Sequence, residues 1–217
     1  MVILLSALSA LAVVLTIVAI NLGRSADRKA AAPTTTTATT RPIATLPDAA
    51  FTPFRDDKTG FSIRYPTTWE RRIAPHGEVR LYVSNRGAYS ALIRVQEFEK
   101  PTTPENLGDV RAFTDGSVAG DGVQVLKVDP VTINGLIGYR YLYTFVDESS
   151  GIQGAHLHYF LFQGRKANSI IFQALPTEEF TKAEGVFNQM VESFRSDPDP
   201  SVAAPPPTST APPPPGG

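Results

Sequence analysis

Short runs of alternating apolar and polar residues recur between Phe51 and Ser196, and they limit what this chain can fold into. The clearest is FSIRY, residues 61–65, whose first, third and fifth residues are apolar. Such runs are typical of strands with one buried face. Glycine- and asparagine-containing turns between them favour pairing of consecutive strands, so the pattern predicts a mainly antiparallel sheet. The predicted strands are 51–55, 61–65, 78–84, 90–99, 123–128, 139–147, 155–163 and 169–175.

Two segments between or after these strands predict helices. Thr103 can cap a helix over residues 104–113, and Thr177 can cap a longer one that has two glutamates in its first turn. Residues 116–120, GSVAG, are expected to form a loop. Several strands are apolar on both faces, which indicates that helices cover both sides of the sheet. The predicted fold class is therefore α+β, with helices packed on a mainly antiparallel sheet.

The two ends of the chain differ in composition from this central part. Residues 2–22 carry no charged side chain, and about 20 apolar residues suffice to cross a bilayer, so residues 1–22 are predicted to be a transmembrane anchor. A cleaved signal peptide is the alternative. The Thr/Pro/Ala-rich segment 23–48 is predicted to be a disordered linker, and the Pro-rich segment 197–217 an extended tail, either a spacer or a ligand for an aromatic groove. Residues 49–196 remain as the globular domain.

The orientation of the predicted anchor is set by two opposing signals. All nearby basic residues follow the apolar segment, which by the positive-inside rule would place the domain in the cytoplasm. The Thr/Pro-rich linker, by contrast, is typical of spacers in envelope proteins. We give more weight to the linker and predict a single-pass cell-membrane protein that contacts the lipid bilayer through residues 2–22 and has an extracytoplasmic domain.

Charge and cysteine content exclude several classes of function. The chain has 20 Lys and Arg against 21 Asp and Glu, a net charge of −1, so it lacks the positive field of a nucleic-acid-binding protein. It has no cysteine, which excludes disulfides, thiolate metal sites, cysteine nucleophiles and a lipid-modified cysteine.

A metal site is the first chemical possibility. His156 and His158 are two residues apart in a predicted strand, so they point to the same face and could share an ion. Two ligands do not complete a site, and an ordinary solvated or aromatic-stacked face is the alternative. No nucleophile elbow, Ser/His/Asp arrangement or glycine-rich phosphate loop is present in the sequence, so no catalytic residue and no cofactor is assigned.

Other residue types could form a binding surface. Aromatic residues spaced by two in the 139–147 strand could form a ligand platform, although core packing explains the same pattern. A pair of arginines could dock an anionic partner, and the carboxylates Glu97 and Glu99 share one strand face, as a solvated edge also would. The candidate binding residues are Trp69, Arg71, Arg72, Tyr139, Tyr141 and Tyr143.

Motifs at both ends of the central domain resemble those of the PsbP-like superfamily. GFSIRYPTTWE, residues 60–70, is similar to the opening strand of the family with its following tryptophan. NSIIFQALPTEEF, residues 168–180, and VFNQMVESFR, residues 186–195, resemble the last strand and the C-terminal helix. The resemblance implies an α/β/α sandwich with a central, mainly antiparallel sheet.

The resemblance also implies a function class. Relatives include extrinsic subunits of photosystem II, a Ran-binding family and LpqN-like bacterial envelope proteins, most of which bind or assemble rather than catalyse. The leading prediction is a non-enzymatic, membrane-anchored module that binds an envelope protein or a small ligand. The alternatives are a metal-dependent hydrolase or metal-binding protein that uses His156 and His158, and a passive spacer domain.

Overall fold

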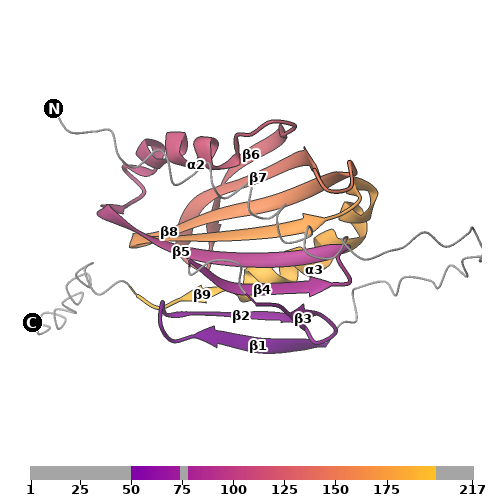
Figure 1. The fold of residues 1–217 in the computed structure, drawn as a ribbon. Helices are drawn as coiled ribbons and strands as arrows, with labels where there is room; N and C mark the ends of the chain where they lie inside the picture. The colour runs from indigo at the N-terminus through magenta and orange to yellow at the C-terminus, as the bar shows by residue number, and fades with distance from the viewer. Residues whose placement is uncertain (1–49, 74–77, 199–217) are drawn as a thin grey trace, which may run out of the picture.

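The computed structural model describes residues 50–73 and 78–198, and within them strands dominate (Figure 1). Two sheets are present in these ranges, with strand orders β1-β2-β9 and β3-β4-β5-β8-β7-β6. Each pairing between strands is antiparallel, as the turns in the sequence predicted. The strands are β1 (Phe51–Asp56), β2 (Phe61–Pro66), β3 (Glu70–Arg71), β4 (Val79–Asn85), β5 (Tyr89–Thr102), β6 (Gln124–Ile133), β7 (Leu136–Val146), β8 (Gln153–Ala174) and β9 (Arg195–Ser196).

The first two strands form the hairpin that their alternation predicted. Phe51 pairs with Pro66 and Asp56 with Phe61, across a turn in which Gly60 has a φ of 71°. This left-handed conformation costs glycine no steric clash. A Cβ at Gly60 would also lie 2.9 Å from Asp197 Oδ2, so the turn is closed tightly against the end of the domain.

β8 differs from the sequence prediction, which had two separate strands, 155–163 and 169–175. It is one element whose first half pairs with β7 and whose second half pairs with β5. The halves contact each other: Asn168 Nδ2 donates to the Leu161 carbonyl, and His156 lies beside Gln173. The chain folds back near Gly164, which has a φ of 58°. The two predicted strands are thus the two arms of a hairpin. They form one element because the strand continues without a break through the turn between them.

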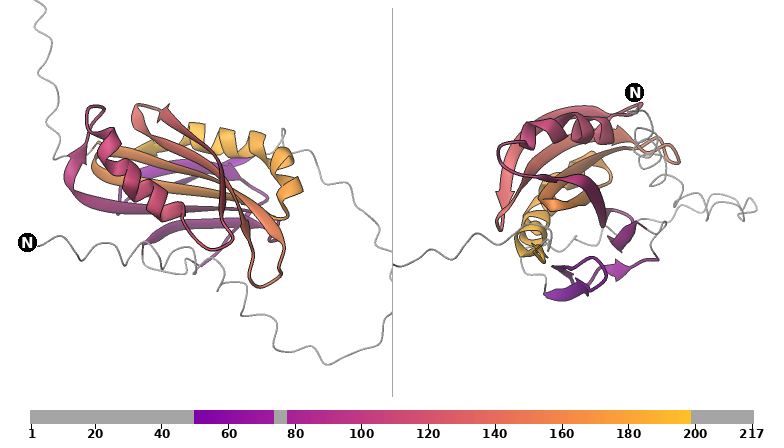
Figure 2. Two further views of the ribbon diagram at one scale, coloured as in Figure 1. Left: turned by 90° about the horizontal axis from the view of Figure 1, so that it is seen from above. Right: turned by 90° about the vertical axis from the view of Figure 1, so that its left-hand side faces the viewer.

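Helices cover both faces of the larger sheet (Figure 2). The 3₁₀ turn η4 (Thr177–Glu179) leads into α3 (Phe180–Ser193), which lies on the face toward the smaller sheet. The turn η3 (Leu107–Val110) leads into α2 (Arg111–Val118) on the opposite face. This arrangement confirms an α+β domain with a mostly antiparallel sheet.

Two details of the predicted helices are wrong. The first helix begins later than predicted and runs to Val118, so the expected loop at 116–120 is helical at its start. A Cβ at Gly116 would meet open space, and packing of the helix outweighs the low helix propensity of this glycine. Neither predicted cap acts as one. Thr177 Oγ1 donates to the Gln153 carbonyl. At the other helix, the Thr103 backbone amide donates to Asn106 Oδ1.

The core is divided by the sheet into two main clusters. Between the larger sheet, α3 and β2 lies an aromatic-rich cluster in which Phe172 stacks on Phe187 and Phe61 stacks on Phe194. Between the sheet and α2 lies a smaller cluster that holds Tyr141, Phe160 and Val118. Together these clusters hold the two helices in place.

Within the described ranges, no helix has the length and apolar character needed to cross a bilayer. The predicted anchor at 1–22 and the linker at 23–48 lie outside the described residues. Of the predicted tail at 197–217, only residues 197 and 198 are described.

Candidate functional site

The two histidines of the sequence analysis lie on the first arm of β8, on the sheet face that α2 partly covers. His156 is 6 % exposed and His158 is 3 % exposed. His156 stacks on Phe145 with ring centroids 4.2 Å apart, and His158 lies 3.9 Å from the ring of Phe160. They therefore share a face, as their spacing predicted, and that face is packed with aromatic rings.

Each histidine has polar partners from the neighbouring strand and arm. His156 Nε2 lies 3.0 Å from Gln173 Oε1 and its Nδ1 lies 3.1 Å from Tyr143 Oη. His158 Nε2 lies 2.6 Å from Ser169 Oγ, and its Nδ1 lies 3.5 Å from the same tyrosine oxygen. A continuous buried network results, with Tyr143 between the two imidazoles.

Burial holds both histidines in the neutral form. Desolvation lowers the pKa of His156 to about 4, partly opposed by its hydrogen bond to Gln173. Desolvation also lowers the pKa of His158 well below its usual value. The charge of Arg94, and that of His156 when it is protonated, act in the same direction. Burial raises the pKa of Tyr143, so this hydroxyl stays protonated. The network is uncharged at neutral pH.

The Ser169–His158 contact has the spacing of a nucleophile and its base, but its surroundings oppose that chemistry. A serine nucleophile needs a base that can hold a proton, usually with a carboxylate behind it. Behind His158 stands the Tyr143 hydroxyl, and Arg94, which is ion-paired with Glu78, disfavours the imidazolium. Ser169 is itself buried. The geometry supports a structural hydrogen bond rather than an activated nucleophile.

The same partners bear on the possibility of a metal site. Each of the four ring nitrogens of His156 and His158 lies within 3.5 Å of another polar atom. Within the described residues, no group of three or more His, Asp or Glu side chains could hold an ion. A metal at this position would have to displace Gln173 or Ser169 and find its remaining ligands elsewhere.

The three tyrosines proposed as a platform face α2. Tyr139, Tyr141 and Tyr143 alternate along β7 with their rings in the smaller core cluster, and Tyr141 is fully buried. Tyr141 Oη donates to Asp115 Oδ1 at 2.7 Å and lies 2.6 Å from Thr114 Oγ1. Tyr141 therefore anchors α2, Tyr139 donates to the Leu107 carbonyl of η3, and the Tyr143 hydroxyl contacts the two histidines.

The other candidate binding residues lie at the opposite side of the domain. Trp69 is 3 % exposed and stacks on Tyr89 in the larger cluster. Arg71 lies over the Phe54 ring at 4.7 Å, and Arg72 pairs with Glu70 at 2.7 Å. Both arginines are exposed, so a surface role remains open for them but not for the tryptophan ring as it is packed here.

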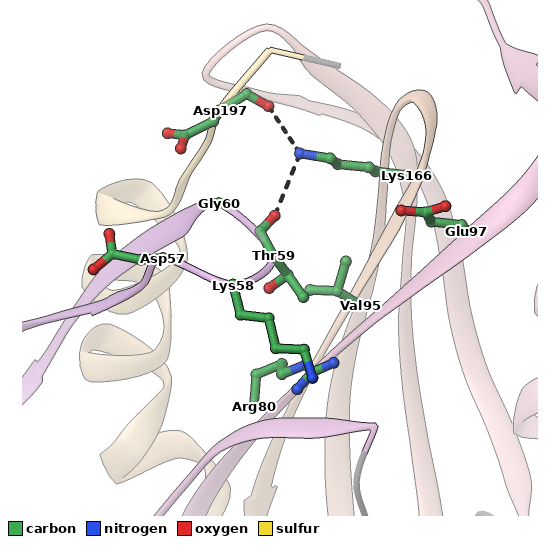
Figure 3. A pocket seen from close by; sticks show the side chains of 9 residues that line it. All are labelled: Asp57, Lys58, Thr59, Gly60, Arg80, Val95, Glu97, Lys166 and Asp197. Carbon is green, nitrogen blue, oxygen red and sulfur yellow. Dashed lines mark hydrogen bonds between the residues drawn. The ribbon is translucent and has the colours of Figure 1, made fainter. Parts of the chain in front are cut away.

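A pocket of about 420 Å³ opens where the two sheets meet (Figure 3). The β1–β2 turn supplies one wall, and β4, β5, β8 and the segment after β9 supply the others. Lys166 Nζ closes one end by donating to the carbonyls of Thr59, at 3.3 Å, and Asp197, at 3.5 Å. The lining residues are Asp57, Lys58, Thr59, Gly60, Arg80, Val95, Glu97, Lys166 and Asp197.

Most carboxylates around this pocket already have partners. Arg55 binds Asp57 at 2.7 Å and Asp197 at 2.6 Å, and its hydrogen bond to Asp197 lowers the pKa of that carboxyl group. Asp56 accepts the Thr59 hydroxyl at 2.6 Å. Sequence reasoning did not find this pocket, because its residues come from five separate segments that only the tertiary structure brings together.

Among the comparisons with known proteins, the one with solved structures finds similar folds. No family model and no curated protein matches the chain. Among solved structures, cyanobacterial PsbP (CyanoP) from Synechocystis sp. PCC 6803 is 13 % identical over 73 % of this chain and 99 % of its own, with a TM-score of 0.51. LpqN of Mycobacterium tuberculosis, described as involved in cell envelope biogenesis, is 14 % identical over 70 % and 92 %, with a TM-score of 0.51.

A protein from Bacteroides thetaiotaomicron is also similar, at 13 % identity and a TM-score of 0.47, but the chain spans only half of its length. The two fuller matches have the sheet and helix arrangement described above. They support the resemblance seen in the motifs at residues 60–70 and 168–195. The described domain therefore has the PsbP-like fold.

Proposed function

We propose that this chain is a non-enzymatic binding or assembly module of the cell envelope, anchored in the membrane by residues 2–22 and carrying its PsbP-like domain outside the cytoplasm. The observation that carries the proposal is the separation of the Ser169–His158 pair from the pocket. The Ser169–His158 pair is buried within the sheet, whereas the residues that line the pocket include neither of them. In catalysis the reactive group must contact the substrate, whereas a pocket can bind a ligand without any contact between the ligand and Ser169 or His158.

The fold likeness supports the same class of function. LpqN is described as involved in cell envelope biogenesis, and it matches this chain across most of both lengths. Because fold alone does not determine function, this likeness narrows the proposal without naming a partner.

An exposed apolar corner offers a place for a protein partner. Val125 and Leu126 on β6 are 46 % and 53 % exposed, and Val146 and Ile152 are 45 % and 43 % exposed. A Cβ at Gly122 would lie 3.7 Å from Val146, and the Asp147 amide donates to the Ile152 carbonyl, so these segments are neighbours. Exposed apolar side chains on neighbouring segments are therefore the residues that the crosslinking test below probes.

Membrane orientation is tested first, because the possible partners depend on the compartment. Ser201→Cys introduces the sole thiol into the predicted tail, since the native chain has no cysteine. Intact and lysed cells are treated with a membrane-impermeant maleimide, with the native chain as the blank. Labelling in intact cells is the expected result. Labelling only after lysis would place the domain in the cytoplasm and overturn the extracytoplasmic part of the proposal.

Partner binding is tested with a photo-crosslinking residue at Leu126 in living cells. We expect a discrete adduct that disappears when the neighbouring Val146 is replaced by Asp, because a charge there disrupts apolar contact. A crosslinker at Lys100, on the exposed part of β5, is the matched control and should give no such adduct. Equal adducts at both positions, or none at Leu126, would remove the apolar corner from the proposal.

The metal-binding alternative is tested by calorimetric titration with zinc, using the native chain and the His156→Gln variant. A metal that binds the folded state releases heat and raises the unfolding temperature. Because the ring nitrogens of both histidines already have partners, we expect no saturable heat from the native chain. A binding isotherm that His156→Gln abolishes would establish the alternative.

A further inference from the structure

The pocket at the junction of the two sheets contains hydrogen-bond donors that the protein does not satisfy. Arg80 Nε is buried and has no hydrogen-bond partner, and its ion pair with Asp56 Oδ2 is long, at 3.9 Å. The Lys58 side chain has no hydrogen bond or ion pair within residues 50–73 and 78–198. A buried guanidinium N–H without an acceptor is costly, and such a group calls for a partner.

The acceptors around the pocket are, by contrast, largely occupied. Asp57 and Asp197 are bound by Arg55, and Asp56 accepts both the Thr59 hydroxyl and the Lys58 amide. Among the described residues, Arg80 therefore has only the long ion pair with Asp56, and the Lys58 side chain has no carboxylate partner. Lys58 and Arg80 are both among the residues that line the pocket, so two cationic side chains border it (Figure 3).

Glu97 is the exception, and it sets the charge that the pocket accepts. It lines the pocket opposite Lys166 in the β5–β8 register, and its carboxylate has no partner among the described residues. With Glu97 counted, the surrounding charges of Arg55, Lys58, Arg80 and Lys166 balance those of Asp56, Asp57, Glu97 and Asp197. Because these charges already balance, an anion is attracted only locally, by Arg80 and Lys58, and the Glu97 carboxylate repels a dianion more strongly than a monoanion.

We infer that this pocket binds a singly charged oxyanion group, a carboxylate or a phosphodiester, between Arg80 and Lys58. Guanidinium groups match the two oxygens of such groups, and a lysine adds a mobile positive charge. A volume of about 420 Å³ also leaves room for the rest of a small molecule that carries the group. This inference goes beyond the proposed partner binding and does not depend on it.

The test uses the full-length chain labelled with ¹⁵N in a zwitterionic detergent. Backbone amide shifts of Lys58, Thr59 and Gly60 are followed during titration with sodium acetate or sodium dimethyl phosphate, with sodium chloride at equal ionic strength as the reference. We expect saturable shifts with half-saturation in the millimolar range, as is usual for a single ion pair that is partly open to water. Saturation by acetate alone identifies a carboxylate ligand, and saturation by dimethyl phosphate alone identifies a phosphodiester.

Variants decide whether the proposed groups are responsible. Arg80→Gln should weaken binding at least fivefold, because a charge-assisted hydrogen bond is lost. Lys58→Gln removes an exposed side chain, so it keeps the test valid if Arg80→Gln fails to fold. Arg64→Gln, which removes the same charge on β2 outside the pocket, is the matched control and should bind as the native chain does.

The role of Glu97 gives a second readout. Inorganic phosphate is mainly a dianion at pH 8, so it should bind more weakly than dimethyl phosphate to the native chain. Glu97→Gln should strengthen binding of the dianion more than binding of dimethyl phosphate. Shifts that do not saturate with either probe, or that are equal in the native chain, Arg80→Gln and Lys58→Gln, would overturn the inference.

Discussion

At the scale of single residues, the buried histidines show how position changes the chemistry of a side chain. In water, His156 would be half protonated near pH 6.5, but burial in the sheet lowers its pKa to about 4. The pKa of His158 shifts in the same direction. The two histidines of residues 156–158, which suggested a pair of metal ligands, are therefore neutral and hydrogen-bonded within the sheet. The residues are at the expected positions on the same face, and their surroundings decide what they can do.

These shifts predict that the domain loses stability in mild acid. A histidine whose folded-state pKa is depressed stabilises the fold fully above its unfolded pKa of about 6.5, and this contribution is lost as the pH falls toward about 4. The expected loss from His156 alone between pH 7.5 and 4.5 is about 2–3 kcal/mol. Urea unfolding across this range measures it. His156→Gln should reduce the slope, and an unchanged slope would contradict the buried neutral state.

A glycine in β7 gives a second test at this scale. A Cβ at Gly138 would lie 1.8 Å from the Phe160 carbonyl oxygen. Because this oxygen belongs to the backbone, the clash can be relieved only if the backbone moves. Gly138→Ala should therefore destabilise the domain by about 3 kcal/mol or more, as overpacking and strain do. Gly116→Ala is the matched control, because a Cβ there meets open space in a helix. It should stabilise the domain by up to about 1 kcal/mol, and thermal unfolding compares the two.

At the scale of secondary-structure elements, α2 depends on side-chain anchors because it has only 8 residues. Isolated helices of this length are marginal in water, so packing and hydrogen bonds must hold it. Tyr141 from β7 supplies both: its ring contacts the Phe160 ring edge-on, and its hydroxyl binds Asp115 and Thr114. The helix is therefore fixed to the sheet by a residue that sequence analysis placed on a possible ligand platform.

This anchoring predicts the effect of removing one oxygen atom. Tyr141→Phe keeps the buried ring and removes one of the two donors to Asp115 Oδ1, the other being Arg111 Nε. This should cost about 1 kcal/mol and speed amide hydrogen exchange in α2. Tyr65→Phe is the control, because Tyr65 lies on β2 with only partial burial. Unchanged exchange in α2 would show that ring packing alone holds the helix.

At the scale of the whole molecule, the last strand connects α3 to the smaller sheet. β9 pairs with β2, and Phe194 just before it stacks on Phe61 in the larger core cluster. The Asp197 amide donates to the Gly60 carbonyl at 2.7 Å, and its carboxylate binds Arg55. The C-terminal end of the domain thus closes the β1–β2 hairpin onto α3 and the larger sheet.

This closure predicts where the chain can be shortened. A chain of residues 49–198 should unfold at the same temperature as the full-length chain, because it keeps each contact just described. A chain of residues 49–193 loses Phe194 and β9 and should be less stable by about 3–5 kcal/mol, the usual cost of emptying a buried phenylalanine site. Equal stability of the two shortened chains would show that the smaller sheet is held without β9.

The sequence by itself determined the fold class, because period-2 alternation and helical spacing are local patterns that point to a sheet and its covering helices. It also placed the β1–β2 hairpin and the shared face of His156 and His158, since both follow from neighbours in the chain. Only the tertiary structure decided the polar partners of the histidines and the pocket of Arg80, Lys58 and Glu97. These depend on strand order, which sets contacts between distant residues and therefore leaves no local pattern in the sequence.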